Sequence, residues 1–326
     1  MKEQTRRRCV SLIANRKKLK HIFFGKSRLM HLVCAAMYTL EGIEIEEESL
    51  KASKKLLKRK VGPFSYFRRT AYLPIVAMID RSTNPEELID QGLKVYKLLK
   101  EDLIGSSYLA LSALIIAQKA EPEEYEQVVN RTLALYKKIK KGHRFLTSGE
   151  DTTSCALMAL SDKTDEELLE DADACYSLLI ARFHSANAVQ SLSNILALYE
   201  GSAQEKCNRT FELFDRLKAN GCKYGTWFEL PTLGVLAMAE AKIETITMKM
   251  LFGDEWLSKE GELLGKIGRK QRLMYAGILA QQDCMVGNTL QIAVVNGTIA
   301  LIVARQAAMY AVVLEIVKYL VKYFPQ

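Results

Sequence analysis

The sequence predicts an all-α protein built from tandem helix hairpins, arranged either as an open α/α superhelix or as a closed α/α toroid. Two observations predict it: a motif recurs about every 40 residues, and alanine-rich apolar segments alternate with that motif. We expect residues 1–25 to form a basic N-terminal helix or arm and residues 26–242 to form the hairpin array. Residues 243–326 are expected to be C-terminal helices that cap the array within one continuous domain.

The recurring motif has an acidic start, a helical stripe of apolar residues and an aromatic residue near its end. The aromatic residues follow one another at intervals of 40, 40 and 38 residues, and they are Tyr96, Tyr136, Tyr176 and Phe214. Three copies open on a polar residue with an acid three positions later, namely Asn84 with Glu87, Thr164 with Glu167 and Ser202 with Glu205. This spacing is typical of a capping box, so these positions are predicted to begin helices.

Shorter segments of different character lie between the amphipathic copies. They are apolar nearly all round and rich in alanine, and they centre on Ala36, Val76, Leu114, Leu157, Ile195 and Val235. A helix without a polar face must be buried, and alanine allows neighbouring helices to approach closely. We therefore expect these segments to form an inner layer and the capped helices to form an outer one.

The pattern changes from about Ile243 onward. The apolar run of residues 290–304 is too short for a membrane span, which needs about 20 residues, and Gln291 and Asn296 interrupt it. In the segment that follows, Glu315, Lys318 and Lys322 share one helical face. We expect these C-terminal helices to be core or capping elements, with an interface to a membrane or a partner as the alternative.

Positive charge is concentrated at the N-terminus. Residues 1–30 contain ten Lys and Arg residues against one acid, Glu3, whereas the chain as a whole carries +8. A basic end of this kind is consistent with binding to nucleic acid or to an anionic membrane surface. The residues expected to contact nucleic acid are Arg6, Arg7, Arg8, Arg16, Lys17 and Lys18. The other interpretation is a solvated helix face, because no nucleic-acid-binding motif accompanies the charges.

Cysteine usage predicts a cytoplasmic protein. The seven cysteines are odd in number, widely scattered and never arranged as C-x-x-C, which argues against a disulfide framework and against a structural zinc site. The basic N-terminus lacks the apolar stretch of a secretion signal.

A binding surface is expected where the loops leading from each outer helix to the next inner helix emerge, since all of them leave the same end of the array. Loops on one face of a rigid scaffold concentrate binding groups. The candidate residues in these loops are Phe64, Arg68, Arg69, His143, Arg144, Ser148, Glu150, Asp151, His184, Trp227 and Glu229. Helix capping is the alternative role for Ser148, Glu150 and above all Asp151.

The sequence assigns no catalytic residue and no metal site. None of the four histidines has another ligand at helical spacing, and no Walker loop, dinucleotide fingerprint or nucleophile elbow is present. The acidic cluster Glu170, Asp171 and Asp173 lies in an amphipathic copy whose polar face is expected to be solvated. No motif points to a cofactor.

Three stretches together resemble a known family: Lys26–Gly42, then VGPFSYFRR, then HRFLTSGED with the repeat after it. They resemble an uncharacterised bacterial family, domain of unknown function number four thousand and three, from about His21 to beyond Ala280. The resemblance implies an all-helical bacterial cytoplasmic protein, and it implies no activity, ligand or catalytic residue.

Three functions are compatible with these features. The favoured one is an interaction scaffold for a protein, peptide or ligand, because the repeat scaffold is plain while catalytic constellations are lacking. The alternative is an enzyme or small-molecule binder with a pocket at the loop face of a toroid, where His143, Glu150, Asp151 and Glu229 would act. Nucleic-acid binding through the N-terminal region is the weaker third possibility.

Overall fold

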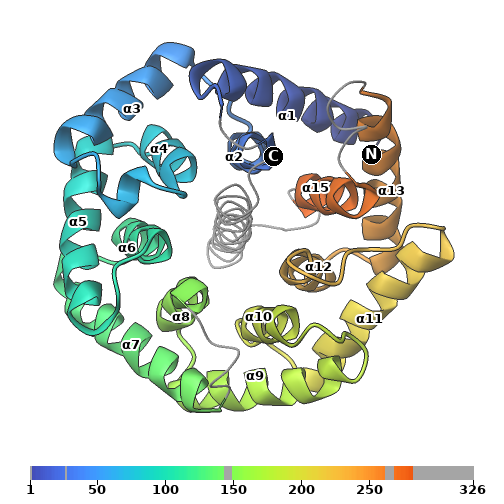
Figure 1. Cartoon of the computed structure of the whole chain (residues 1–326). Helices are drawn as coiled ribbons and strands as arrows, with labels where there is room; N and C mark the ends of the chain where they lie inside the picture. The colour runs from blue at the N-terminus through green and yellow to red at the C-terminus, as the bar shows by residue number, and fades with distance from the viewer. Residues whose placement is uncertain (1, 26–27, 143–148, 261–267, 282–326) are drawn as a thin grey trace, which may run out of the picture.

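Alternating outer and inner helices form a ring in the computed structural model, which describes residues 2–25, 28–142, 149–260 and 268–281 (Figure 1). The outer helices are α1 (Lys2–Ile22), α3 (Glu47–Lys60), α5 (Pro85–Asp102), α7 (Tyr125–Gly142), α9 (Asp165–Ile180), α11 (Ala203–Ala219) and α13 (Ile243–Lys259). The inner helices are α2 (Arg28–Leu40), α4 (Tyr72–Asp80), α6 (Ser107–Lys119), α8 (Thr152–Ala159), α10 (Ala186–Leu196), α12 (Leu230–Ala237) and α15 (Arg269–Gln281). The predicted all-α class is confirmed.

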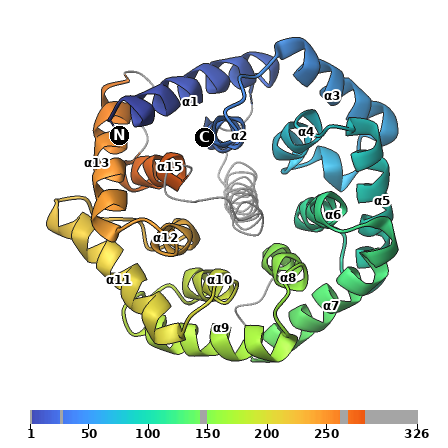
Figure 2. The same ribbon diagram turned by 180° about the vertical axis from the view of Figure 1, so that it is seen from behind.

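The ring is closed, which is one of the two arrangements that the sequence leaves open. Helices α13 and α15 pack against α1 and α2, so the last described hairpin borders the first (Figure 2). The Arg8 guanidinium on α1 donates a hydrogen bond to the Leu279 carbonyl at 3.1 Å, and the Tyr275 hydroxyl donates to the Leu29 carbonyl at 3.3 Å. Both bonds join segments from opposite ends of the described chain.

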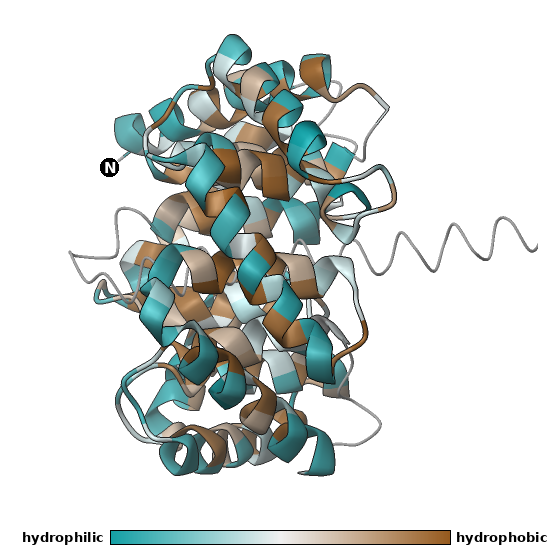
Figure 3. Ribbon diagram, turned by 90° about the vertical axis from the view of Figure 1, so that its left-hand side faces the viewer, coloured by the Kyte–Doolittle hydropathy of each residue, from teal (hydrophilic) through white to brown (hydrophobic). Residues whose placement is uncertain are grey.

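The two layers follow the composition of their helices. Every residue from Leu73 to Ile79 in α4 is buried, and so is every residue from Leu109 to Ile116 in α6, as expected for helices without a polar face. The outer helices alternate hydrophilic and hydrophobic residues, as two-faced helices do (Figure 3). The assignment of alanine-rich segments to an inner layer and capped helices to an outer layer therefore matches the structure.

Capping boxes begin the outer helices as predicted. The Thr164 hydroxyl accepts the Glu167 amide at 3.2 Å while the Glu167 carboxylate accepts the Thr164 amide at 2.8 Å. The same reciprocal pair forms at Ser202 and Glu205, and Asn84 accepts the Glu87 amide. Each cap satisfies backbone N–H groups that have no partner inside the helix.

Two of the four repeated aromatic residues pack against connecting loops at one end of the ring. Tyr96 of α5 packs edge-on against Phe67 with ring centroids 5.3 Å apart, and Phe214 of α11 packs edge-on against Phe183 at 5.2 Å. Phe67 and Phe183 each lie in the outer-to-inner connection of the preceding hairpin. In these two copies the motif thus couples neighbouring hairpins.

The expected boundaries near residues 25 and 243 do not separate different architectures. Helix α1 is the outer helix of the first hairpin, and α13 with α15 forms a further hairpin of the ring. Residues 282–326, which include the apolar run 290–304 and the amphipathic segment after it, lie outside the described residues. Among the helices that are described, none combines the length and apolar character needed to cross a membrane.

Candidate ligand-binding pocket

The candidate residues of the predicted binding surface do not all lie together. All its loops run from an outer helix to the start of an inner helix, so they share one end of the ring, but they lie around its circumference (Figure 1). His143, Arg144 and Ser148 lie outside the described residues, and so does the side chain of Glu150. The remaining candidates can be placed individually.

Phe64, Arg68 and Arg69 belong to the connection between α3 and α4, across the ring from the connections that carry His184 and Trp227 (Figure 1). The Phe64 side chain is exposed, the Arg68 guanidinium donates to the Val61 carbonyl at 3.3 Å, and Arg69 stacks over the Tyr66 ring at 4.9 Å. These contacts stay within the connection itself. The structure does not bring the three residues to the other candidates.

Asp151 and Glu229 are buried instead of facing the solvent. Asp151 occupies the N-cap position of α8, but its side chain makes no capping hydrogen bond there, in contrast to the role favoured from the sequence. Glu229 is only 4% exposed, and its carboxylate accepts the Trp227 amide at 3.3 Å. Burial therefore removes both carboxylates from the loop surface.

His184 and Trp227 come together in one pocket between consecutive hairpins. The cavity has a volume of about 590 Å³ and is bordered by the α9–α10 and α11–α12 connections and by the end of α11. We call it the His184–Trp227 pocket; its lining residues are Arg182, Phe183, His184, Ser185, Phe214, Lys218, Lys223, Thr226 and Trp227. Its size is that of small-molecule sites.

The pocket lining is basic, and no acidic side chain belongs to it. Arg182 is paired with Asp215 and lies 4.8 Å from the centroid of the Phe211 ring, which fixes its guanidinium. Lys218 and Lys223, in contrast, are exposed and form no ion pair with any residue of the described ranges. Two uncompensated ammonium groups therefore favour an anion in this cavity.

The start of α10 adds to this preference for negative charge. Ser185 occupies the N-cap position of α10, yet its hydroxyl makes no capping hydrogen bond. An uncapped helix start presents backbone N–H groups and the positive end of the helix dipole. Trp227, whose side chain is 65% exposed, supplies an indole face at the same pocket. The lining thus combines anion donors with an aromatic surface.

The buried carboxylate of Glu229 contacts the loop that carries Trp227. A methyl group built on Gly225 would lie 2.3 Å from the carboxyl carbon of Glu229, so the loop folds tightly over that carboxylate. Burial raises the pKa of Glu229, and the Trp227 amide and Lys270 oppose the shift. Glu229 does not line the pocket, so it positions the loop and does not touch a ligand.

Replacing Glu229 by glutamine is expected to remove one component of the pH dependence of stability. Because the folded-state pKa is raised, the folded state binds more protons than the unfolded state between the ordinary and the raised pKa. The unfolding free energy of the native chain should therefore fall as pH rises through that window, and E229Q should lack this fall. Urea denaturation of both proteins from pH 4 upward measures the difference; parallel pH profiles would contradict the assignment.

The cations of the pocket were not among the residues predicted from the sequence. Arg182 lies in the same loop as His184, and Lys223 lies in the same loop as Trp227. Lys218 lies in the last turn of α11, just before the second of these loops. Their selection would have required knowing that these two connections are neighbours while the Phe64 loop is remote. The order of hairpins along the chain contains that signal, because consecutive hairpins are adjacent in the ring.

Of the residues proposed to contact nucleic acid, Arg8, Arg16 and Lys18 are buried or bonded within the protein, whereas Arg6, Arg7 and Lys17 are exposed. Arg16 is 5% exposed, so the expectation that it contacts nucleic acid is wrong. Lys18 donates to the Glu44 carboxylate and the Ile45 carbonyl, both at 2.8 Å. Arg6 and Arg7 pair with Glu3, Arg8 joins α1 to α15, and Lys17 is exposed.

Nothing in the described ranges gathers three or more His, Cys, Asp or Glu side chains into a group that could hold a metal ion. The six cysteines within these ranges are buried and unpaired, namely Cys9, Cys34, Cys155, Cys175, Cys207 and Cys222. Burial raises the pKa of the Cys9 thiol to about 12, so this thiol is poorly reactive at neutral pH.

Comparison with known proteins gives a family but no activity. The model of a family described as "Protein of unknown function (DUF4003)" matches residues 15–308. The chain is similar to the uncharacterized protein YeaA of Bacillus subtilis (strain 168), with 24% identity over 221 residues, which are 66% of this chain and 67% of YeaA. No solved structure matches the chain.

Proposed function

The chain belongs to the DUF4003 family of proteins of unknown function, and we propose that it binds a small anionic ligand with an aromatic group. The site is the His184–Trp227 pocket. The observation that carries this proposal is the lining of that cavity, where Lys218 and Lys223 are uncompensated beside an exposed indole. A phosphate or carboxylate would lie near the two ammonium groups and the start of α10, and an aromatic ring would stack on Trp227.

The closed ring favours this function over a scaffold for a polymeric partner. An open superhelix would expose a long concave surface for a protein or peptide, whereas here the first and last described hairpins meet. Binding is favoured over catalysis because neither Asp151 nor Glu229, the two proposed acid or base carboxylates whose side chains are described, belongs to the pocket lining. Small-molecule binding, one of the alternatives compatible with the sequence, is therefore the function that the geometry supports best.

Tryptophan fluorescence can test the proposal directly, because the chain contains only two tryptophans. Trp256→Phe leaves Trp227 as the single reporter. In this background we expect adenosine monophosphate to quench the emission, whereas adenosine and inorganic phosphate, which each supply half of the recognised chemistry, should bind more weakly. Substituting Lys218→Ala and Lys223→Ala together should weaken binding about tenfold, if each charge contributes roughly 0.7 kcal/mol.

Lys97→Ala serves as the matched control, because Lys97 is an exposed lysine on α5, away from the pocket. Its affinity should equal that of the parent protein. Rising salt should weaken binding in the parent and have a smaller effect in the double lysine variant. Equal affinity of the double lysine variant and the control, or emission of Trp227 that no ligand changes, would refute the proposal.

A further inference from the structure

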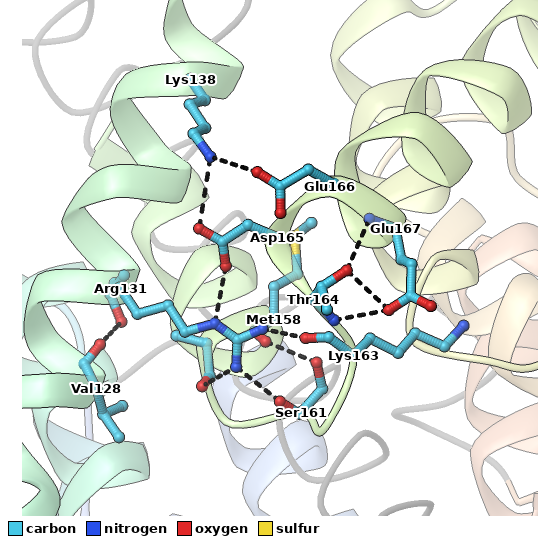
Figure 4. A network of polar contacts seen from close by, with 12 residues as sticks. Val128, Arg131, Lys138, Met158, Ser161, Lys163, Thr164, Asp165, Glu166 and Glu167 are labelled. Atoms are coloured by element: carbon cyan, nitrogen blue, oxygen red, sulfur yellow. Dashed lines mark hydrogen bonds and ion pairs between the residues drawn. The ribbon is translucent and has the colours of Figure 1, made fainter.

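In several repeats, the side chain at one equivalent position of the outer helix binds backbone carbonyls at the end of the inner helix. Arg131 of α7 lies five residues before Tyr136, and it binds the chain that leaves α8 (Figure 4). Its guanidinium donates to the Ala159 carbonyl at 3.0 Å, to the Ser161 carbonyl at 2.7 Å and to the Lys163 carbonyl, while Asp165 accepts from its Nε at 2.8 Å. One arginine thus satisfies three carbonyls at the end of an inner helix.

Arg209 of α11 repeats this arrangement five residues before Phe214. It donates to the carbonyls of Ala237 at 2.8 Å, Ala239 at 3.0 Å and Ala241 at 3.4 Å. In both hairpins the three carbonyls belong to the fifth, third and first residues before the next outer helix's N-cap, which is Thr164 or Lys242. The match in register shows that the two arginines occupy equivalent places.

The hairpin between these two uses lysines for the same purpose. Its equivalent position is Asp171, which pairs with the buried Lys206. Lys206 donates to the Tyr199 carbonyl at 3.1 Å, and Lys163 donates to the carbonyls of Ala197 at 3.1 Å and Tyr199 at 2.6 Å. Ala197 and Tyr199 are again the fifth and third residues before the N-cap, Ser202. A cationic group therefore lies at this place in all three hairpins.

The α5–α6 hairpin has Gln91 at this position, five residues before Tyr96, and a cavity of about 480 Å³ lies beside it. We call it the Gln91 pocket; it is lined by Gln91, by the end of α6 from Ala117 to Ala120, by the ends of α2 and α4, and by the chain at the starts of α5 and α7. The amide oxygen of Gln91 is buried and accepts no hydrogen bond from the described part of the chain. No side chain of the hairpin takes the role of Arg131 here.

Two backbone carbonyls at the end of α6, those of Ala117 and Gln118, receive no helical hydrogen bond, whereas the Ile116 carbonyl accepts the Ala120 amide at 2.9 Å. The Glu121 amide, which would bond the Ala117 carbonyl in a longer helix, donates to the Glu124 carboxylate at 3.0 Å instead. Pro122 has no N–H for the Gln118 carbonyl. Glu41, Glu87 and Glu121 also line the cavity, and its cations are Lys119 and Arg81, the latter already paired with Glu41. Helix C-terminal carbonyls and carboxylates together favour a cation.

We propose that the Gln91 pocket binds the guanidinium group of a ligand, in the place that Arg131 and Arg209 fill in their own hairpins. A guanidinium presents five N–H donors in a rigid planar fork, which suits several carbonyls at once. The cavity is much larger than this group, so it also accommodates the chain that carries it. The ligand is a small guanidine compound or an arginine residue. This pocket lies at the opposite end of the inner helices from the His184–Trp227 pocket.

Thermal unfolding of the full chain tests the proposal with millimolar probes. Agmatine represents a small guanidine compound, and N-acetyl-arginine amide represents an arginine residue; the probe that gives the larger increase in Tm identifies the source. N-acetyl-citrulline amide, which has nearly the same shape without the charge, should leave Tm unchanged. Any ligand that binds only the native state raises Tm. An equal response to the citrulline and arginine compounds would overturn the proposal.

Variants built from the repeat itself provide the controls. Gln91→Arg should fill the pocket from within, raise Tm by about 2 °C without ligand and abolish the response to agmatine. Gln91→Lys tests the same point if the arginine variant does not fold. Arg131→Gln copies the Gln91 hairpin, so it should lower Tm and respond to agmatine more strongly than the native chain. A native-sized agmatine response in Q91R or Q91K would place the ligand elsewhere and refute the inference.

Discussion

Arg131→Gln is expected to lower the free energy of unfolding by about 3 kcal/mol. The substitution removes the donors of three carbonyls at the end of α8 and leaves Asp165 without its guanidinium partner. An unpaired buried acceptor costs about 1–3 kcal/mol, and the 24% exposure of the Arg131 side chain allows water to recover part of the loss. Urea denaturation followed by far-ultraviolet circular dichroism measures the change.

Arg216→Ala is the matched control for this prediction. Arg216 is exposed on α11 and pairs with Glu212 one helical turn away at 2.9 Å. Exposed pairs of this kind contribute roughly 0.5 kcal/mol or less. If the Arg131 and Arg216 variants lost equal stability, the carbonyl contacts of Arg131 would not matter for folding.

Lys206→Met should lower the free energy of unfolding by about 3 kcal/mol, because it leaves the carboxylate of Asp171 beside an apolar side chain. Lys206 is 2% exposed and Asp171 is 17% exposed, so water can compensate little. Lys163, whose ammonium is 4.0 Å from Asp171, supplies the remaining compensation. The same urea denaturation measures this loss.

Asp171→Asn combined with Lys206→Met distinguishes a charge effect from a packing effect. Removing both charges eliminates the uncompensated carboxylate, so the double variant should be more stable than Lys206→Met alone. Additive losses in the double-mutant cycle would mean that the two side chains do not interact, against the contact between them. The Arg216 variant again gives the reference for an exposed site.

Local chemistry predicted much of the fold. The capping pairs at Thr164 and Ser202 and the alanine-rich segments identify the outer and inner helices, because caps and burial are properties of single helices. The hairpin of α13 and α15 was not recognised as part of the array. Its N-cap residue, Lys242, makes no side-chain capping bond, although Phe252 of α13 continues the aromatic series 38 residues after Phe214.

The site was predicted only in part, since its formation depends on which loops are neighbours. His184 and Trp227 were selected by residue type and share one pocket, whereas Phe64 satisfied the same criteria but belongs to the α3–α4 connection, on the other side of the ring. Glu229 was expected at the surface, yet the tight turn at Gly225 folds the chain over its carboxylate. Contacts of this kind arise from packing between segments, which residue type and spacing do not specify.

Joining the first hairpin to the last also changes how the molecule should come apart. An open solenoid has two end units that each have a neighbour on one side only, and these can fray while the middle stays folded. Here the seam held by Arg8 with Leu279 and Tyr275 with Leu29 gives every described hairpin two neighbours. Unfolding of any one hairpin therefore exposes two interfaces at once. We expect denaturant to unfold the whole ring of hairpins in a single cooperative transition.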